Sequence, residues 1–381
     1  MSRFSSSRQL ALSQKIRQIN WVLILIVVAA ATIGVAMLYS AADGSWDPWA
    51  ARQITRFTVG LVILVTIALV DLRFWWRYAY LLFAILLALL LAVEVAGSTG
   101  MGAQRWINLG VIKLQPSELM KIGLILALAR YFHGVSMENV RRIPYLLIPL
   151  LLVALPSILV LKQPDLGTAL FLVLIGVTVF FIAGVRIWKF VLALAATGVA
   201  IPIVWSMLRT YQQKRILTFF NPEIDPLGAG YHILQSKIAL GSGGVFGKGF
   251  MQGSQSHLNF LPEKQTDFIF TMMAEEFGMM GGLTLLGLYS LILVYGFAIS
   301  LRSQSHFGRL LALGLTAMMF LYVFINIAMV MGLIPVVGVP LPLISYGGTA
   351  MLTQMVGIGF LINVNVHRDL YMSRTGGSLA N

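Results

Sequence analysis

The chain has no cysteine and few charged residues. Without cysteine, its 381 residues can form neither a disulfide nor a thiolate metal site. Charged residues make up only 11% of the chain and hydrophobic residues 58%, whereas a soluble domain typically has about 25% charged residues. The composition therefore predicts an integral membrane protein.

Histidine is also scarce, and its five copies form neither the His-x-x-x-His nor the His-Glu-x-x-His spacing of a zinc site. The glycine-rich stretch Gly241–Gly249 departs from the phosphate-loop pattern G-x-x-x-x-G-K-[ST], because Ser242 stands at its first position and Gly249 at its last. We therefore exclude a nucleotide site there. Two alternatives stay open: a flexible loop at the membrane surface, or a backbone that approaches a phosphate closely.

Long apolar runs predict an all-α polytopic membrane protein with about ten transmembrane helices. A helix needs about 20 apolar residues to cross a hydrocarbon core of about 30 Å. Eight runs are long enough, and two weaker candidates, Phe57–Val70 and Leu119–Phe132, complete the set. The eight are Trp21–Tyr39, Phe74–Val95, Ile143–Leu161, Leu166–Ala183, Phe190–Met207, Phe270–Ile299, Leu310–Leu333 and Leu343–Ile362.

The distribution of Lys and Arg predicts the orientation, because cytoplasmic loops are enriched in both. Residues 1–20 lack a signal cleavage site and are expected to be a cytoplasmic tail. We therefore expect a single transmembrane domain at 21–363 and a cytoplasmic tail at 364–381. Residues 209–266, between the seventh and eighth helices, form a large extracytoplasmic loop. The net charge of +13 partly reflects this cytoplasmic excess of basic residues, which is expected beside anionic lipids. It therefore does not indicate nucleic acid, and we expect no nucleic acid partner.

Within the large loop, Tyr231–Leu240 has the apolar spacing of an amphipathic helix that lies on the bilayer. Four polar stretches are also predicted on the outer side. They are Gly102–Gly110 with Gln115–Lys121, Gln163–Thr168, Phe260–Phe270 and Val339–Gly348.

Each polar stretch has a structural interpretation as well as a functional one. Asp165 and Asp267 stand in predicted first helical turns, where a carboxylate favours the positive end of the helix dipole. Glu118 and Lys121 are three residues apart on one helix face and can neutralise each other. Ionisable groups near membrane depth are nevertheless expected to be functional, because burying them without a purpose is costly.

Six motifs resemble the SEDS (shape, elongation, division and sporulation) family, and its RodA branch more than its FtsW branch. They are GAQRWINLG, QPSELMK, QPDLGTA, NPEIDPLGAGYHILQSKIALGSGG, FLPEKQTDFIF and VGVPLPLISYGG, and they follow the family's order between Gly102 and Gly348. The resemblance implies a peptidoglycan glycosyltransferase that polymerises lipid II outside the bacterial cytoplasmic (inner) membrane during elongation and maintenance of rod shape. It also implies a partner, a class B penicillin-binding transpeptidase.

The resemblance implies roles for individual residues. The family's essential aspartate matches Asp267. Its other important polar positions match Arg105, Trp106, Glu118, Lys121 and Asp165. Asp267 is expected to be either the general base for the acceptor hydroxyl or a ligand of a divalent cation, Mg²⁺ or Mn²⁺.

Cations are expected to stabilise the undecaprenyl pyrophosphate that leaves in an inverting displacement. Lys121 and Arg105 are the first candidates, with Glu118 orienting Lys121 and Asp165 positioning a cation or sugar. The weaker candidates are Lys113, Lys237, Lys248 and Lys264.

Other classes of function stay open at this point. A lipid II flippase or other transporter also has many helices, intramembrane charges and proline-broken spans. A carrier concentrates its charges near the bilayer midplane, whereas most of the acidic and basic candidates above cluster toward one predicted face. Glu94, Glu275 and Glu276 are the exceptions. A division polymerase of the FtsW type and a non-catalytic scaffold are the remaining alternatives.

Overall fold

The computed structural model describes residues 11–100, 103–108, 110, 113–208, 210–221, 229–258, 260 and 263–373. All ten predicted spans coincide with helices in it, so the prediction of a polytopic helical fold is confirmed. These helices are α2 (Trp21–Ala41), α3 (Ala50–Leu69), α4 (Leu72–Ala96), α5 (Pro116–Gly134), α7 (Leu147–Lys162), α8 (Leu166–Ile182), α9 (Ile187–Met207), α13 (Ile269–Arg302), α14 (His306–Val330) and α15 (Gly348–Val366). By length and composition, seven membrane-span candidates are found among the described residues, with α8 and Ile187–Pro202 as shorter apolar helices.

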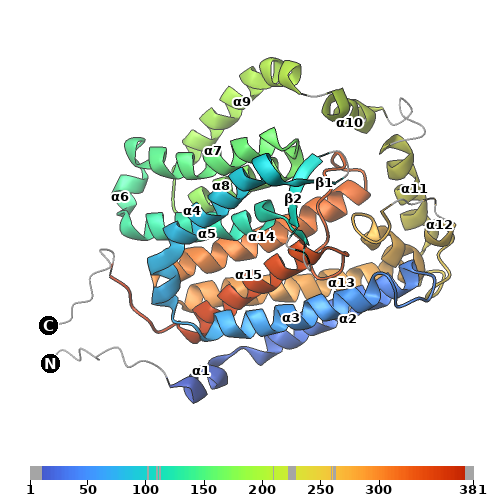
Figure 1. Ribbon diagram of the computed structural model, residues 1–381, viewed down its shortest axis with the longest axis horizontal. Helices are drawn as coiled ribbons and strands as arrows, with labels where there is room; N and C mark the ends of the chain where they lie inside the picture. The colour runs from blue at the N-terminus through green and yellow to red at the C-terminus, as the bar shows by residue number, and fades with distance from the viewer. Residues whose placement is uncertain are drawn as a thin grey trace.

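The remaining elements are short and lie at the two ends of the bundle (Figure 1). At one end are α1 (Leu12–Gln18), α6 (Met137–Val140) and the 3₁₀ helix η1 (Pro144–Leu146). At the other are β1 (Ser98–Gly100), β2 (Ala103–Asn108), β3 (Lys113–Leu114), α10 (Thr210–Phe220), α11 (Ala229–Ser242) and α12 (Ser254–His257). The segments predicted to be cytoplasmic and those predicted to be outside are thus at opposite ends.

Helices α5, α14 and α15 form the centre of the bundle and carry long runs of buried residues. Helix α15 packs along α3, α4 along α5, and α13 along α14. Buried asparagine fixes one of these contacts, since Asn363 Nδ2 donates to the carbonyls of Ile67 (2.8 Å), Ala68 and Val70 at the end of α3. The bundle therefore combines apolar packing with a few buried amides.

Helix α9 differs from the others because most of its described side chains are exposed. Val191, Leu194 and Val199 have exposed fractions of 61%, 73% and 81%. In Figure 1, α9 and α10 arch away from the other helices. Such an apolar, uncovered helix suits contact with lipid rather than with the protein core.

Helix α13 is broken at Gly278, whose φ is 64° and ψ is −161°. The glycine-rich loop that follows α11 fills the break with backbone hydrogen bonds. Lys248 N–H donates to the Glu275 carbonyl (3.0 Å), and Met279 N–H donates to the Gly244 carbonyl (2.9 Å). Further bonds join Gly249 to Glu276 and Met280 to Val245. The interpretation of Gly241–Gly249 as a flexible loop was wrong, because these bonds hold its backbone against α13.

The glycines are needed there because the two backbones nearly touch. A Cβ atom on Gly243 would lie 2.0 Å from the Ala274 carbonyl oxygen, and one on Gly247 would lie 2.1 Å from that of Glu276. No real side chain tolerates such contacts. The amphipathic helix predicted at Tyr231–Leu240 exists as part of α11, which packs on α13. Its Ser236 hydroxyl lies 2.8 Å from the Thr271 hydroxyl.

Three local expectations need correction. Helix α13 begins at Ile269 with Phe268 as its N-cap, so Asp267 precedes the helix instead of lying in its first turn. The predicted tenth span begins at Leu343, but α15 begins at Gly348, and Leu343 has a positive φ of 66°. Three short antiparallel strands follow α4, where the sequence predicted only a polar loop. Asp165 does begin a helix, and its carboxylate accepts from Thr168 N–H (3.1 Å) as the N-cap of α8.

Candidate active site

Asp267 lies where two irregular segments run side by side. One is the turn at residues 263–268 before α13, and the other is the segment 331–347 between α14 and α15. Tyr346 N–H donates to the Gln265 carbonyl (2.8 Å), and the Ser345 hydroxyl donates to the Thr266 carbonyl (2.6 Å). Both bonds involve residues directly before Asp267, so they fix the position of its backbone.

The Asp267 side chain is half-buried and faces Gly338. A Cβ atom on Gly338 would lie 3.5 Å from Asp267 Oδ2. The Asp267 carbonyl accepts from Asn326 Nδ2 (3.1 Å), which also donates to the Val339 carbonyl (2.7 Å). A side chain of α14 thus holds both segments next to the carboxylate.

Glu118 and Lys121 form a buried ion pair whose third member is Tyr322 of α14. Lys121 Nζ lies 2.6 Å from Glu118 Oε1 and 2.6 Å from the Tyr322 hydroxyl. That hydroxyl donates to Glu118 Oε2 (2.6 Å). Only 2% of Lys121 and 5% of Glu118 are exposed. The Lys121 ammonium also lies 4.6 Å from the centre of the Phe171 ring, so its charge is enclosed on several sides.

Arg105 and Asp165 form a second pair, which is more open. Arg105 Nε lies 3.6 Å from Asp165 Oδ2, and the Arg105 side chain is 30% exposed. Its Nη2 donates to the Pro164 carbonyl (2.5 Å). Strand β2 presents Arg105, while Trp106 pairs with Ser98 of β1. Arg105 therefore joins the small sheet to the start of α8.

The four polar stretches predicted on the outer side meet in the structure. Gln115 N–H donates to the Thr349 hydroxyl (3.2 Å), and that hydroxyl donates to the Lys113 carbonyl (3.1 Å). A Cβ atom on Gly167 would lie 2.7 Å from the Val337 carbonyl oxygen, so the start of α8 packs against the segment before α15. Asp267 faces the residue that follows Val337, Gly338. The segment 331–347 therefore lies between Asp267 and α8, the helix that Asp165 begins.

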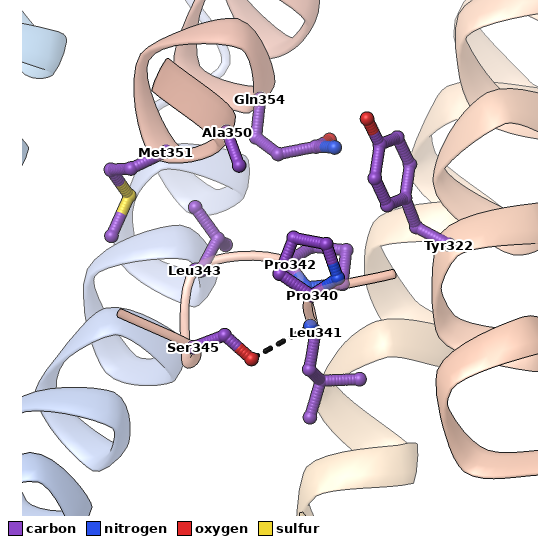
Figure 2. A pocket seen from close by; sticks show the side chains of 9 residues that line it. All are labelled: Tyr322, Pro340, Leu341, Pro342, Leu343, Ser345, Ala350, Met351 and Gln354. Carbon is purple, nitrogen blue, oxygen red and sulfur yellow. Dashed lines mark hydrogen bonds between the residues drawn. The ribbon is translucent and has the colours of Figure 1, made fainter. Parts of the chain in front are cut away.

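A small cavity of about 10 Å³ lies beside Tyr322 (Figure 2). Its other lining residues come from Pro340–Leu343, Ser345 and the first turns of α15. The Gln354 amide projects into it in Figure 2, and its Nε2 has no hydrogen-bond partner in the part of the chain that the structure describes. A cavity of this size holds about one water molecule and no sugar. A groove of about 280 Å³ between α13 and α14 is lined almost wholly by apolar side chains and does not suit a pyrophosphate either.

The other four predicted cations have different surroundings. Lys248 Nζ binds the buried Glu275 carboxylate (2.7 Å) and the Ser254 hydroxyl, beside the break in α13. Lys264 is buried, with 6% exposed, in the turn before Asp267. Lys237 is exposed on α11, and Lys113 is exposed in β3.

The sequence analysis missed Tyr322 and Asn326. They lie one helical turn apart on α14, and each contacts a polar stretch that was predicted. Both stand within a long apolar run, where a single tyrosine or asparagine carries no motif. A polar residue inside a predicted span was the available signal, because such a residue requires a partner.

Comparison with known proteins identifies the family. A family model described as "Cell cycle protein", covering FtsW, RodA and SpoVE, matches residues 20–370. The peptidoglycan glycosyltransferase MrdB of Escherichia coli K12 is 43% identical over 352 residues, which cover 91% of this chain and 93% of MrdB. The chain belongs to the FtsW/RodA/SpoVE family.

Two solved structures agree with this assignment. A chain from a peptidoglycan synthase complex that coordinates polymerization and crosslinking has a TM-score of 0.81 and 33% identity, and the match covers 92% of this chain and 98% of that one. The rod shape determining protein RodA of Thermus thermophilus has a TM-score of 0.70 and 29% identity, with coverage of 92% and 98%. The expected SEDS membership and the expected peptidoglycan glycosyltransferase activity are thus confirmed.

Proposed function

We propose that the chain polymerises lipid II with Asp267 as the catalytic carboxylate. The observation that carries this proposal is that Asn326, Ser345 and Tyr346 hold the backbone around Asp267 next to the segment 331–347. The start of α8 packs against the same segment. A half-buried carboxylate at the outer end of a helical bundle can reach a sugar that is attached to a membrane lipid. It also remains within a partly desolvated site, where electrostatic effects are stronger.

In the proposed reaction, Asp267 accepts the proton of the acceptor sugar hydroxyl. The hydroxyl oxygen forms a bond to the anomeric carbon of the donor, and the bond from that carbon to the phosphate oxygen breaks. The electron pair leaves with undecaprenyl pyrophosphate, and the configuration at the carbon is inverted. General base catalysis of this kind typically contributes about 10²–10⁴-fold to the rate.

The geometry favours Arg105 over Lys121 for direct contact with the leaving pyrophosphate. Arg105 is partly exposed, and a guanidinium fits phosphate oxygens well. Lys121 is enclosed, and the adjacent Glu118 carboxylate offsets its charge. We therefore propose that Arg105 binds the phosphate, whereas Glu118, Lys121 and Tyr322 hold α5 and α14 in register behind it.

A divalent cation would fit this site in only one way. Among the described residues, no group of three or more His, Cys, Asp or Glu side chains is placed to hold a metal ion. Mg²⁺ is commonly bound by one or two carboxylates together with substrate phosphates and water. In this alternative role, Asp267 would supply the protein ligand instead of acting as the base, and the pyrophosphate would supply other ligands. Bound there, Mg²⁺ or Mn²⁺ would neutralise the charge that develops on the leaving group.

We further propose a location in the bacterial inner membrane with both tails in the cytoplasm, and a class B transpeptidase as the partner. The Lys and Arg distribution supports the orientation. Asn365 near the end of α15 donates to the Gln18 carbonyl of α1 (2.9 Å), so the two described ends of the chain lie on the same side. The related chain from a polymerization and crosslinking complex supports the choice of partner.

Three glutamates of the predicted spans lie outside the four polar stretches, and their positions argue against a carrier. Glu94 is exposed near the outer end of α4, two residues before that helix ends. Glu275 and Glu276 directly precede the break in α13, next to the outer glycine loop, and Glu276 accepts from the Ser40 hydroxyl (2.5 Å). A carrier is expected to place such groups at the midplane.

The test of the proposed function is polymerisation of labelled lipid II by purified protein with its transpeptidase partner. We expect Asp267→Asn to lower the polymer yield by at least about 10²-fold, since it removes the base and leaves the side-chain shape nearly unchanged. Glu263→Gln is the matched control, because Glu263 lies in the same turn, and it should retain activity. Wild-type polymer yield from Asp267→Asn would eliminate the assigned role.

A further inference from the structure

Asn326 lies four residues before the end of the apolar helix α14 and is completely buried, with 0% exposed. Its Nδ2 donates to the carbonyls of Asp267 (3.1 Å) and Val339 (2.7 Å). These two carbonyls belong to the two irregular segments that meet at the candidate active site. Neither segment is helical there, so their backbone carbonyls need partners from elsewhere in the protein.

The cost of placing Asn326 there is visible in the structure. Its Oδ1 is buried and has no hydrogen-bond partner among the described residues. A buried acceptor without a partner lowers the free energy of unfolding. The side chain thus uses both N–H donors on the segments around Asp267, although its own oxygen stays unpaired.

We infer that Asn326 is a positioning residue that fixes Asp267 for catalysis by tying its backbone to that of Val339. Asn326 does not touch the substrate in this role. It acts through Asp267, and the inference therefore rests on the proposed function of that residue. A displacement of a catalytic group by about 1 Å can lower the rate by about 10²-fold, so even a small shift of this backbone affects turnover.

The chain contains a matched control for this inference. Asn363 in α15 is also completely buried, its Nδ2 donates to backbone carbonyls of α3, and its Oδ1 likewise has no described partner. It lies about 22 Å along α15 from the end that borders the active site. Replacing either asparagine by leucine removes the same chemistry from a buried site. Only Asn326 is tied to Asp267.

The experiment compares Asn326→Leu, Asn363→Leu and Asp267→Asn in lipid nanodiscs with labelled lipid II. Thermal unfolding is measured first, and kcat and KM are then measured well below the lowest transition. We expect Asn326→Leu to lower kcat by about 10²-fold, with KM changed less than about threefold, since the substrate contacts remain. Asn363→Leu should lower stability and leave kcat within about twofold of the wild type.

If Asn326→Leu does not fold, Asn326→Ala decides, because alanine also lacks the N–H donors and adds no volume to the buried site. It should show the same loss of kcat. An unchanged kcat in the folded Asn326 variant, or a change confined to KM, would overturn the inference. Asp267→Asn separates the two failures: if it is inactive while the Asn326 variant is normal, only the positioning role is wrong. If Asp267→Asn is active, the proposed function of Asp267 itself is wrong.

Discussion

The Tyr322 hydroxyl lies 2.6 Å from Lys121 Nζ and 2.6 Å from Glu118 Oε2. The ammonium, the carboxylate and the hydroxyl thus form a closed ring of three hydrogen bonds across α5 and α14. Each bond involves a charged group, and such bonds are roughly twice as strong as neutral ones. The ring explains how a lysine and a glutamate remain stable inside an apolar bundle.

Replacing Tyr322 by Phe should destabilise the protein by about 1–3 kcal/mol, because the change leaves a buried ammonium and a buried carboxylate each short of a partner. Tyr289→Phe is the control. Tyr289 is equally buried, but its hydroxyl donates to a neutral group, the Pro342 carbonyl. Tyr289→Phe should therefore lower the free energy of unfolding by only about 0.5–1.5 kcal/mol. Thermal unfolding in detergent measures both. A smaller loss for Tyr322→Phe than for Tyr289→Phe would contradict the ring's importance.

Replacing Gly278 by Ala should destabilise the junction between α13 and the glycine loop. The residue has a positive φ, and a Cβ atom would lie 2.4 Å from the Gly247 nitrogen. The backbone strain alone is about 1–3 kcal/mol, and the overlap adds to it. Gly287 lies in the same helix with nothing within 4 Å of its Cβ position. Gly287→Ala should be neutral or stabilising by up to about 1 kcal/mol. Equal unfolding temperatures for the two variants would argue against the described packing.

Burial lowers the pKa of His367 below its ordinary value of 6.5, although the bond to the Asn363 carbonyl and the nearby Asp71 carboxylate oppose the shift. Lys15 and Arg73 lower the pKa further. Because the unfolded chain then binds the proton more readily, His367 stabilises the fold above pH 6.5, and this contribution is lost as the pH falls toward the lower folded pKa. We expect the unfolding temperature of the wild type to fall over this interval more than that of His367→Gln. Parallel pH profiles would show that His367 is not responsible.

The sequence predicts the helices well, because apolar runs of spanning length leave the backbone few alternatives in a membrane. Asp165 illustrates a local success, since an aspartate before an apolar run is a typical N-cap. The same rule fails for Asp267. The Asp267 backbone is instead fixed by Asn326, Ser345 and Tyr346 in or near distant elements, and such tertiary contacts leave no local pattern.

The candidate site was predictable as a set of motifs but not as a geometry. Lys121 and Arg105 were expected to be equivalent cations, yet one is enclosed by Glu118 and Tyr322 and the other is partly exposed. Lys248 was expected near the substrate, but the buried Glu275 holds it. In each case the partner lies far away in the sequence or carries no motif of its own, so only the folded arrangement distinguishes the roles.

The break in α13 also sets the depth of the site. The part from Met279 to Arg302 is about 36 Å long at about 1.5 Å per residue, which is enough to cross a hydrocarbon layer of about 30 Å without help. The part from Ile269 to Phe277 adds about 13 Å and is free to stand in the headgroup layer. Asp267 precedes this upper part. By this length, a carboxylate that precedes the upper part need not enter hydrocarbon at all.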